Sequence, residues 1–411
     1  MAETAKKPAI RFKGFTGAWE QRKLGEMVQF SKGTGYSKGD LKESGTPIIL
    51  YGRLYTKYET VIADVDTFAD EKPGSVFSRG GEVIVPASGE TAEDISIASV
   101  VEKSGVLLGG DLNIITPPTD IDSAFLAISI SNGKPHNDMA KMAQGKSVVH
   151  LHNTDLEKID LAYPSHEEQI WISGFFRGID NLITLHQRKL KKLQNLKKSC
   201  LEKMFPKNGS NVPEIRFSGF TEAWEQRKLK DIADKVTEKN ADLAVEETFT
   251  NSAEYGIISQ RDFFDHDISN ADNIGGYYVV RNDDFVYNPR ISATAPVGPV
   301  NRNKLGRNGV MSPLYTVFRT HGIDTTYLGW FFKSNYWHSF MYLNGDSGAR
   351  SDRFSIKDAV FFGMPIPVPD FVEQHRIGVW LDSLDNLITL HQRKLKKLQN
   401  LKKACLEKMF V

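Results

Sequence analysis

Few residues in this sequence have the types and spacing that catalysis requires. His150 and His152 alternate as two metal ligands on a strand could, but no Cys or carboxylate cluster accompanies them. Asn288-Pro289-Arg290 is similar to the start of the Asn-Pro-Pro-aromatic motif of amino-methyltransferases. The second proline and the aromatic residue are missing, and no glycine-rich cofactor loop precedes the segment. Neither segment therefore predicts a metal site or a methyl-transfer site.

Two further motifs point the same way. Pro369-Asp370 with Glu373 is similar to the opening of a nuclease PD-(D/E)xK site, but His375 stands where the lysine is needed. The chain has no GxxxxGK[ST] segment, so no ATP motor is predicted. We therefore expect no catalytic residue, no metal site and no cofactor in this chain.

Length and composition predict a protein of two or more globular domains. The chain has 411 residues, 40% of them hydrophobic and 25% charged, and its formal net charge is only +1. A partner attracted by charge must therefore meet a local patch. No apolar stretch approaches the ~20 residues that cross a bilayer, and two cysteines cannot form a disulfide framework. We expect a cytoplasmic protein without membrane contact.

The chain is a tandem duplication with an offset of 205 residues. Ile10 to Leu24 returns as Ile215 to Leu229 with 13 of 15 residues identical, and Asp180 to Phe205 returns as Asp385 to Phe410 with one change in 26. The interiors, residues 25–163 and 230–368, share almost nothing. They contain short apolar segments bounded by turn residues, such as those at 81–86, 112–115, 277–280 and 314–318, which predict strands.

We therefore predict an α+β fold of two mixed α/β domains, each followed by a long helix. Ser165 with Glu168, and Asp370 with Glu373, predict capping boxes at the helix starts. An amphipathic stripe narrow enough for a coiled-coil seam follows, clearest from Ile179 to Met204, and the 26 matched residues span about 39 Å at ~1.5 Å per residue. The predicted boundaries are 1–164 and 214–369 for the domains, 165–205 and 370–411 for the helices, and 206–213 for the linker.

Exposed helix positions are repeated as faithfully as apolar ones, which packing alone does not require. This favours two helices that present one surface to two copies of a single partner, while the two domains recognise different things. A recent duplication is the alternative, but the divergence of the interiors argues against it. The residues predicted for helix pairing and partner docking are Ile183, Leu190, Lys191, Lys192, Leu193, Leu196, Lys197, Ile388, Leu395, Lys396, Lys397, Leu398, Leu401 and Lys402.

The doubled frame, the RF-x-GF-x-x-x-WE-x-x-KL opening, the P-x-x-x-EQ helix entry and the LEKMF ending resemble the specificity (S) subunit of type I restriction-modification systems. The resemblance implies that each domain is a target recognition domain that reads one half of a bipartite site in double-stranded DNA. It implies that the two helices pair antiparallel as a spacer and dock two methyltransferase (M) subunits, which restriction (R) subunits join. S-adenosylmethionine, ATP and magnesium are then expected in those partners.

The two repeated helical blocks together carry a charge of +10, so the rest of the chain is acidic on average. Contacts to DNA must then come from local clusters, with base reading by a few polar side chains. In the first domain we predict Arg53, Tyr55, Lys57, Tyr58, Ser88, Glu90, Thr91, Gln144, Lys146 and Ser147. In the second we predict Asn288, Arg290, Arg302, Lys304, Arg307, Ser347, Arg350, Ser351 and Arg353. The same residue types also form ordinary solvated turns.

Two other functions remain open at this point. A cytosolic scaffold, with a coiled coil joining two protein-binding domains and no role on DNA, agrees with the acidic average of the domains. A self-sufficient modifying or cleaving enzyme needs motifs that the sequence lacks. Trp19 and Trp224 lie at repeated positions in apolar surroundings, so we predict that they anchor the two cores.

Overall fold

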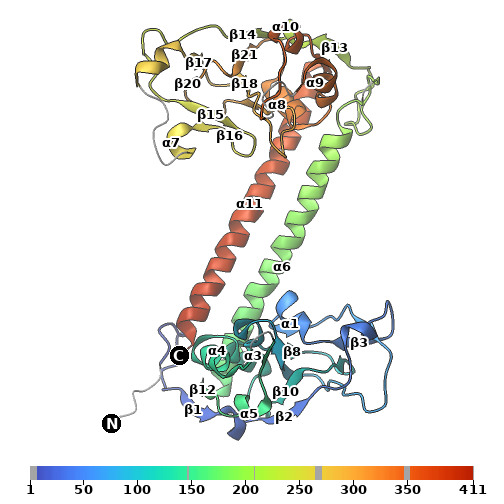
Figure 1. Ribbon diagram of the computed structural model, residues 1–411, viewed down its shortest axis with the longest axis vertical. Coiled ribbons are helices and arrows are strands. Elements are labelled where there is room, and N and C mark those ends of the chain that lie inside the picture. Colours follow the sequence, from blue (N-terminus) through green and yellow to red (C-terminus); the bar gives the residue numbers. More distant parts are fainter. Residues whose placement is uncertain (1–6, 146–147, 208, 264–270, 347–351, 411) are drawn as a thin grey trace. The chain divides into compact units, whose positions relative to one another are not determined.

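A computed structural model describes residues 7–145, 148–207, 209–263, 271–346 and 352–410. The chain forms two compact units. Unit 1 contains residues 1–188 and 392–411, and unit 2 contains residues 189–391. Helix α6 (His166–Lys203) and helix α11 (Phe371–Met409) each contribute residues to both units, and Figure 1 shows both as continuous helices.

Unit 1 is built on a five-stranded sheet in the order β2-β10-β6-β8-β4, in which only the β4–β8 pair is parallel. The strands are rich in Val and Ile, and every residue of β6 is buried because α3 packs on one face and further apolar side chains cover the other. The strands are β1 (Glu20–Lys23), β2 (Gln29–Lys32), β3 (Thr46–Ile49), β4 (Val61–Ile62), β5 (Phe68–Ala69), β6 (Glu82–Pro86), β7 (Ser88–Gly89), β8 (Ser99–Val101), β9 (Leu107–Leu108), β10 (Leu112–Thr116), β11 (Val149–His150) and β12 (Asp160–Tyr163). The helices are α1 (Gly52–Thr56), α2 (Ala92–Ile95), α3 (Ser123–Ile130), α4 (Gly133–Met142) and α5 (Asn153–Leu156), with 3-10 turns at Leu24–Glu26 and Lys38–Asp40.

Unit 2 contains a four-stranded antiparallel sheet in the order β14-β21-β18-β19, covered by an aromatic core that includes α8. Its strands are β13 (Glu225–Lys228), β14 (Ala233–Lys235), β15 (Phe249–Ser252), β16 (Gly256–Ser259), β17 (Tyr278–Val280), β18 (Phe285–Tyr287), β19 (Val300–Arg302), β20 (Gly309–Met311), β21 (Thr316–Thr320) and β22 (Pro365–Val368). Its helices are α7 (Gln260–Phe263), α8 (Thr325–Lys333), α9 (His338–Asn344) and α10 (Asp358–Phe361), with 3-10 turns at Leu229–Asp231 and Ala271–Gly276.

The predicted class, two mixed α/β domains each followed by a long helix, is confirmed. Three of the four predicted strands occur as β6, β10 and β17. The fourth, β21, begins at Thr316 because Tyr315 N–H donates to the Ser312 carbonyl at 3.0 Å and closes a turn before it. Trp19 and Trp224 are buried in the two cores, as predicted.

The repeated opening and helix-entry segments bind each other inside each unit. Arg11 donates two hydrogen bonds to the Glu168 carboxylate at 2.5 and 2.6 Å. Arg216 donates two to Glu373, both at 2.7 Å. Both glutamates are fully buried, so each ion pair fixes the N-terminal segment of its domain to the start of the long helix.

These ion pairs correct the prediction of capping boxes. Asp370 does cap α11, since its Oδ1 accepts from the backbone N–H groups of Val372 and Glu373 at 2.9 and 3.0 Å. In unit 1, Ser165 Oγ accepts from Glu168 N–H at 3.5 Å. The two glutamate side chains do not return to the cap, because arginines from a distant part of the sequence take both of their oxygens.

The glutamine that follows each glutamate joins the long helix to the domain. Gln169 Oε1 accepts from the backbone N–H of Asp122 at 2.9 Å, and Gln374 Oε1 accepts from that of Asp324 at 2.8 Å. These two aspartates are the N-caps of α3 and α8. The repeated Glu-Gln dipeptide is therefore explained by contacts within each unit.

The long helices run antiparallel inside each unit. In unit 1 Phe176 lies 6.0 Å from Phe410 between ring centroids, and Lys402 Nζ donates to Asp180 at 2.6 Å, so rising numbers on α6 meet falling numbers on α11. In unit 2 Lys197 pairs with Asp385, which stands 205 residues after Asp180.

The ends of the two repeated helical blocks supply apolar side chains to the cores of both units. Cys405 and Met409 pack with Trp19 and Phe125 in unit 1, while Phe410 covers that core from a partly buried position. In unit 2, Cys200, Met204 and Phe205 are buried in a cluster with Trp224, Tyr327 and Phe331. Each domain core is thus completed by the end of the helix that belongs to the other half of the sequence.

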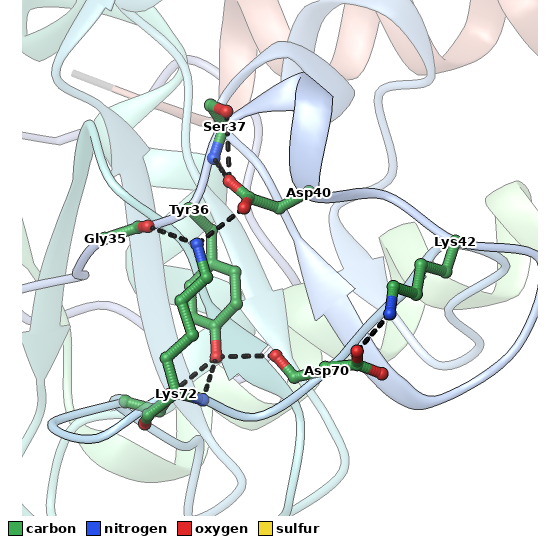
Figure 2. Close-up of polar contacts among 8 residues, drawn as sticks. Gly35, Tyr36, Ser37, Asp40, Lys42, Asp70 and Lys72 are labelled. Carbon is green, nitrogen blue, oxygen red and sulfur yellow. Dashed lines mark hydrogen bonds and ion pairs between the residues drawn. The ribbon is translucent and has the colours of Figure 1, made fainter.

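Tyr36 holds two loops of unit 1 together (Figure 2). Its hydroxyl donates to the Asp70 carbonyl at 3.0 Å, lies 2.6 Å from Ser75 Oγ and accepts from Lys72 N–H at 2.9 Å. Lys72 Nζ lies 4.7 Å from the Tyr36 ring centroid and donates to Asp40 at 2.6 Å. The hydrogen bonds from Lys72, and next those from Ser37, lower the pKa of Asp40 to about 2.

Replacing Tyr36 with phenylalanine is expected to destabilise unit 1 by about 1–3 kcal/mol, because the hydroxyl leaves behind partners that are themselves partly buried. The midpoint of urea unfolding should fall with an unchanged m-value. Tyr58→Phe is the matched control, since the exposed Tyr58 hydroxyl makes only a 3.5 Å contact with Ser131. Equal effects of the two substitutions would contradict the role given to Tyr36.

Candidate nucleic-acid interface

Three segments predicted to read DNA meet at one place in unit 1. Strand β7 pairs with β11 in the register Ser88 to His150, and Gln144 closes a loop by exchanging two backbone hydrogen bonds with His150 at 3.1 and 2.8 Å. The Tyr55 ring lies beside the β7 turn, 3.9 Å from the position of a Cβ on Gly89. We call Tyr55, residues 88–91, Gln144 and His150 the unit 1 loop surface.

The turn at 88–91 depends on close packing. A Cβ on Gly89 would lie 2.5 Å from an Ile95 methyl carbon, so glycine is required there. Thr91 caps α2 by accepting from Asp94 N–H at 3.1 Å, which fixes the turn. Ser88 is buried, whereas Glu90, Thr91 and Gln144 are exposed.

Among the described residues, Glu90 gives the unit 1 loop surface a negative charge. Burial, and then the negative groups Glu90 and Asp94 among its neighbours, raise the pKa of Tyr55. Carboxylates repel DNA phosphates but accept hydrogen bonds from the cytosine amino group. The exposed amide of Gln144 and the parallel rings of His150 and His152, with centroids 6.3 Å apart, add further polar groups. This surface suits base edges better than backbone phosphates.

Arg53 and Lys57 form ion pairs within unit 1, and the Tyr58 hydroxyl lies 3.5 Å from Ser131 Oγ. The Arg53 side chain is only 8% exposed and is held by Asp66 at 2.6 Å and Glu59 at 2.7 Å. Lys57 binds Asp66 at 2.8 Å, and the hydrogen bonds from Lys57 and then Arg53 lower the pKa of Asp66 to about 2. The charges of Arg53 and Lys57 are therefore engaged within unit 1.

In unit 2 two of the three predicted segments lie side by side. Arg290 pairs as an isolated bridge with Arg353, and Phe354 N–H donates to the Pro289 carbonyl at 2.8 Å. Asp346 and Ser355 exchange two backbone hydrogen bonds that close the intervening loop, as Gln144 and His150 do in unit 1. We call residues 288–290 and 352–355 the unit 2 loop surface. Lys146, Ser147, Ser347, Arg350 and Ser351 lie outside the described residues.

Arg290 is a largely exposed cation of the unit 2 loop surface. Its side chain is 71% exposed, and its Nη2 lies 3.7 Å from Asp352 Oδ2. Asn288 is held in place by its side chain, which donates to the Asn251 carbonyl at 2.8 Å and accepts from Arg290 N–H at 2.9 Å. Arg290 is therefore available to a ligand while its backbone is fixed.

Arg302, Lys304 and Arg307 make other contacts. Arg302 is largely buried and donates to the hydroxyls of Thr325 and Thr326 at 2.6 and 3.0 Å. Lys304 Nζ lies 3.5 Å from Asp382 of α11. Arg307 donates to both oxygens of Glu247 at 2.6 and 2.7 Å.

Sequence reasoning missed a buried amide network that supports Asn288. Asn251 Nδ2 donates to the Val286 carbonyl at 2.7 Å, and Asn301 Nδ2 donates to Asn251 Oδ1 at 2.6 Å. Asparagine is depleted in strands. The occurrence of Asn251 in β15 and Asn301 in β19 was therefore the sequence feature that could have indicated this network.

The residues predicted for helix pairing and docking differ in exposure. Ile388 is buried, and Ile183, Leu190, Leu193, Leu395 and Leu398 are half-buried. Lys197 and Lys402 are half-buried and paired with Asp385 and Asp180. Leu196 and Leu401 are exposed, as are Lys191, Lys192, Lys396 and Lys397.

In the described ranges, no group of three or more His, Cys, Asp or Glu side chains is arranged to hold a metal ion. No helix within the described part of the chain is both long and apolar enough to cross a membrane.

Comparisons with known proteins agree with the duplicated architecture. The family model described as "Type I restriction modification DNA specificity domain" matches twice, at residues 17–195 and 221–400. A type I restriction enzyme MjaVIII specificity subunit of Methanocaldococcus jannaschii is 22% identical over 191 residues, which is 44% of each chain. The chain therefore matches less than half the length of that curated relative. The crystal structure of a type I restriction-modification S subunit from M. genitalium matches with a TM-score of 0.60 and 11% identity over 98% of this chain and 99% of that one, which shows a shared fold.

Proposed function

Because two copies of the specificity domain match most of its length, the chain belongs to the type I restriction-modification DNA specificity family, and we propose that it is the specificity subunit of such a system. Each target recognition domain reads one half of a bipartite, asymmetric DNA site. The observation that carries the proposal is that nearly identical N-terminal and helical segments flank both domains, whereas the loop surfaces at corresponding places in the two domains have different side chains.

The chemistry of the two loop surfaces predicts different half-sites. Unit 1 offers Tyr55, Glu90 and Gln144, which include acceptors for base amino groups. Unit 2 offers Arg290 and Arg353, donors of the kind that bind guanine O6 and N7. Two unlike sets of groups select two unlike base sequences, as an asymmetric site requires.

The long helices are the proposed spacer and docking surface for two methyltransferase subunits, through which restriction subunits join the complex. Exposed apolar positions recur in pairs at nearly equal exposure, with Leu182 and Leu387 at 46% and 43%, and Leu196 and Leu401 at 42% and 46%. Exposed leucines are unfavourable in water, and their repetition supports two copies of one partner. Lys191, Lys192, Lys396 and Lys397 flank them with the same charge on both helices.

Catalysis is assigned to the partners in this proposal. S-adenosylmethionine belongs to the methyltransferase subunits, and ATP and magnesium act in the assembled complex. The chain itself contributes sequence recognition and assembly in the cytoplasm. The scaffold alternative is not favoured, because the family model that matches both halves is a DNA specificity domain.

Arg290→Ala is expected to relax base preference at one half-site only and to weaken binding by about 1–3 kcal/mol, the value of one bidentate base contact. The measurement is selection from a random duplex library by the chain co-expressed with its methyltransferase, at two salt concentrations that separate specific from electrostatic binding. Gln144→Ala should change the other half-site.

Arg307→Ala is the matched control, because Glu247 already engages that guanidinium. It should leave both half-sites unchanged. Equal loss at both half-sites in Arg290→Ala would count against separate reading by the two domains, and binding without any sequence preference in the native chain would overturn the proposed function.

A further inference from the structure

Unit 2 contains a polar pocket that neither loop surface uses. It has a volume of about 490 Å³ and lies between α8, β19, the β15–β16 turn and the parts of α6 and α11 that belong to this unit. Four cationic side chains of the described residues line it: Lys197, Arg302, Lys304 and Lys333. The acids that line it are Glu254 and Asp385.

Three of these cations have carboxylate neighbours. Lys197 pairs with Asp385 and lies 4.8 Å from the Trp330 ring centroid. Lys304 lies 3.5 Å from Asp382, and Arg302 Nε lies 3.5 Å from a carboxylate oxygen of Asp283. Their charges are therefore at least partly compensated within unit 2.

Lys333 differs from the other three. Its ammonium donates to Asn301 Oδ1 at 2.6 Å, and no carboxylate of the described residues lies within 4.0 Å of it. An ammonium group has three donors, so two remain for another acceptor. Burial lowers the pKa of Lys333, and the neighbouring charges of Lys197 and Lys304 lower it further. Asp385 acts in the opposite direction and raises this pKa, but its carboxylate pairs with Lys197, so no acid of the described residues binds the Lys333 ammonium directly.

Arg302 adds a guanidinium charge to the pocket wall. Its terminal nitrogen Nη1 is satisfied by the hydroxyls of Thr325 and Thr326, but its buried Nε has no hydrogen-bond acceptor. The 3.5 Å approach of Asp283 to this Nε is an ion-pair distance without hydrogen-bond geometry. An oxyanion in the pocket offers acceptors to ammonium and guanidinium groups together.

We propose that this pocket binds a phosphate group through Lys333, Lys304 and Arg302. The buried lysine distinguishes this pocket from its smaller counterpart in unit 1, because Lys333 stands nine residues after the N-cap of α8, whereas Ser131, nine residues after the N-cap of α3, lines the unit 1 pocket. The phosphate has two sources, the DNA backbone beside the half-site read by unit 2 or free phosphate. The first source rests on the proposed function, and the second does not.

The test begins with inorganic phosphate and the full chain at constant ionic strength. Lys333→Met keeps the apolar stem and removes the charge, and it should weaken phosphate binding at least tenfold by titration calorimetry. Lys304→Gln should weaken phosphate binding several-fold. Because Lys304 is exposed, this variant should fold normally and tests the pocket even if Lys333→Met does not fold. Lys230→Gln removes an exposed charge elsewhere in unit 2 and should stay within twofold of the native chain.

The second arm measures DNA binding by the same variants in the complex with the methyltransferase. If the ligand is a backbone phosphate, Lys333→Met should reduce the slope of log K against log salt by about 0.9 without changing the bases selected. If Lys333→Met loses phosphate binding but the slope of log K against log salt for DNA does not change, the ligand of the pocket is free phosphate. Equal phosphate binding by Lys333→Met and the native chain overturns the proposal. If the native complex shows no sequence preference on DNA but Lys333→Met still weakens the binding of inorganic phosphate, the proposed function is wrong and the phosphate site is supported.

Discussion

Replacing Glu373 with glutamine is expected to destabilise unit 2 by about 3–5 kcal/mol, the usual effect of removing one partner of a buried ion pair. The carboxylate is fully buried, binds Arg216 through both oxygens and also accepts from Trp224 Nε1 at 3.1 Å. A glutamine has one acceptor oxygen and leaves the arginine charge without compensation. Urea unfolding gives the free energy, and hydrogen–deuterium exchange shows whether the loss is confined to unit 2.

Glu168→Gln in unit 1 is the matched variant. It breaks the equivalent pair with Arg11, but Trp19 Nε1 has no hydrogen-bond partner among the described residues, so no such bond is lost. The expected destabilisation is therefore smaller, and it should appear in unit 1. A change below about 0.5 kcal/mol for Glu373→Gln would show that the pair does not hold the N-terminal segment to the helix.

Phe205→Ala is expected to cost about 3–5 kcal/mol, as for other fully buried aromatic residues. Phe205 is 1% exposed, and its ring centroid lies 5.6 Å from that of Tyr327 and 5.9 Å from that of Phe331. Alanine leaves a cavity at the centre of the unit 2 core. Thermal unfolding and exchange of the α8 amide groups measure the effect.

Phe410→Ala removes the same residue from the equivalent place in unit 1. Phe410 is only partly buried, so its loss should cost less than the loss of Phe205. If both alanine variants were tolerated equally, the ends of the long helices would be peripheral to the cores and not components of them.

The repeated segments allowed the duplicated architecture and the long helices to be predicted, because identity over 26 residues is visible without any knowledge of contacts. The roles of Glu168 and Glu373 were not accessible in the same way. Each stands at a capping position, and the arginine that binds it lies 157 residues away. The sequence pattern predicted a bond to the neighbouring cap residue, whereas in the folded chain each glutamate binds a distant arginine.

The candidate site shows a similar division. Segments around Gln144 and Arg290 were found from their composition and position, and the structure brings them to the two loop surfaces. Individual cations could not be ranked, since Arg53 and Arg290 have the same chemistry in sequence. Asp66 and Glu59 reach Arg53 only after the chain folds, and they engage its guanidinium within unit 1.

Each core receives the end of a helix encoded in the other half of the chain, and this sets the order of events during synthesis. Trp19 and Phe125 emerge early from the ribosome, but Met409 and Phe410, which pack against them, are made nearly 300 residues or more later. At ~5–20 residues per second the 205 residues after Phe205 take about 10–40 s. Throughout that interval Trp19 and Phe125 lack the partners that Met409 and Phe410 supply, so the core of unit 1 can be completed only after the residues of unit 2 have been made.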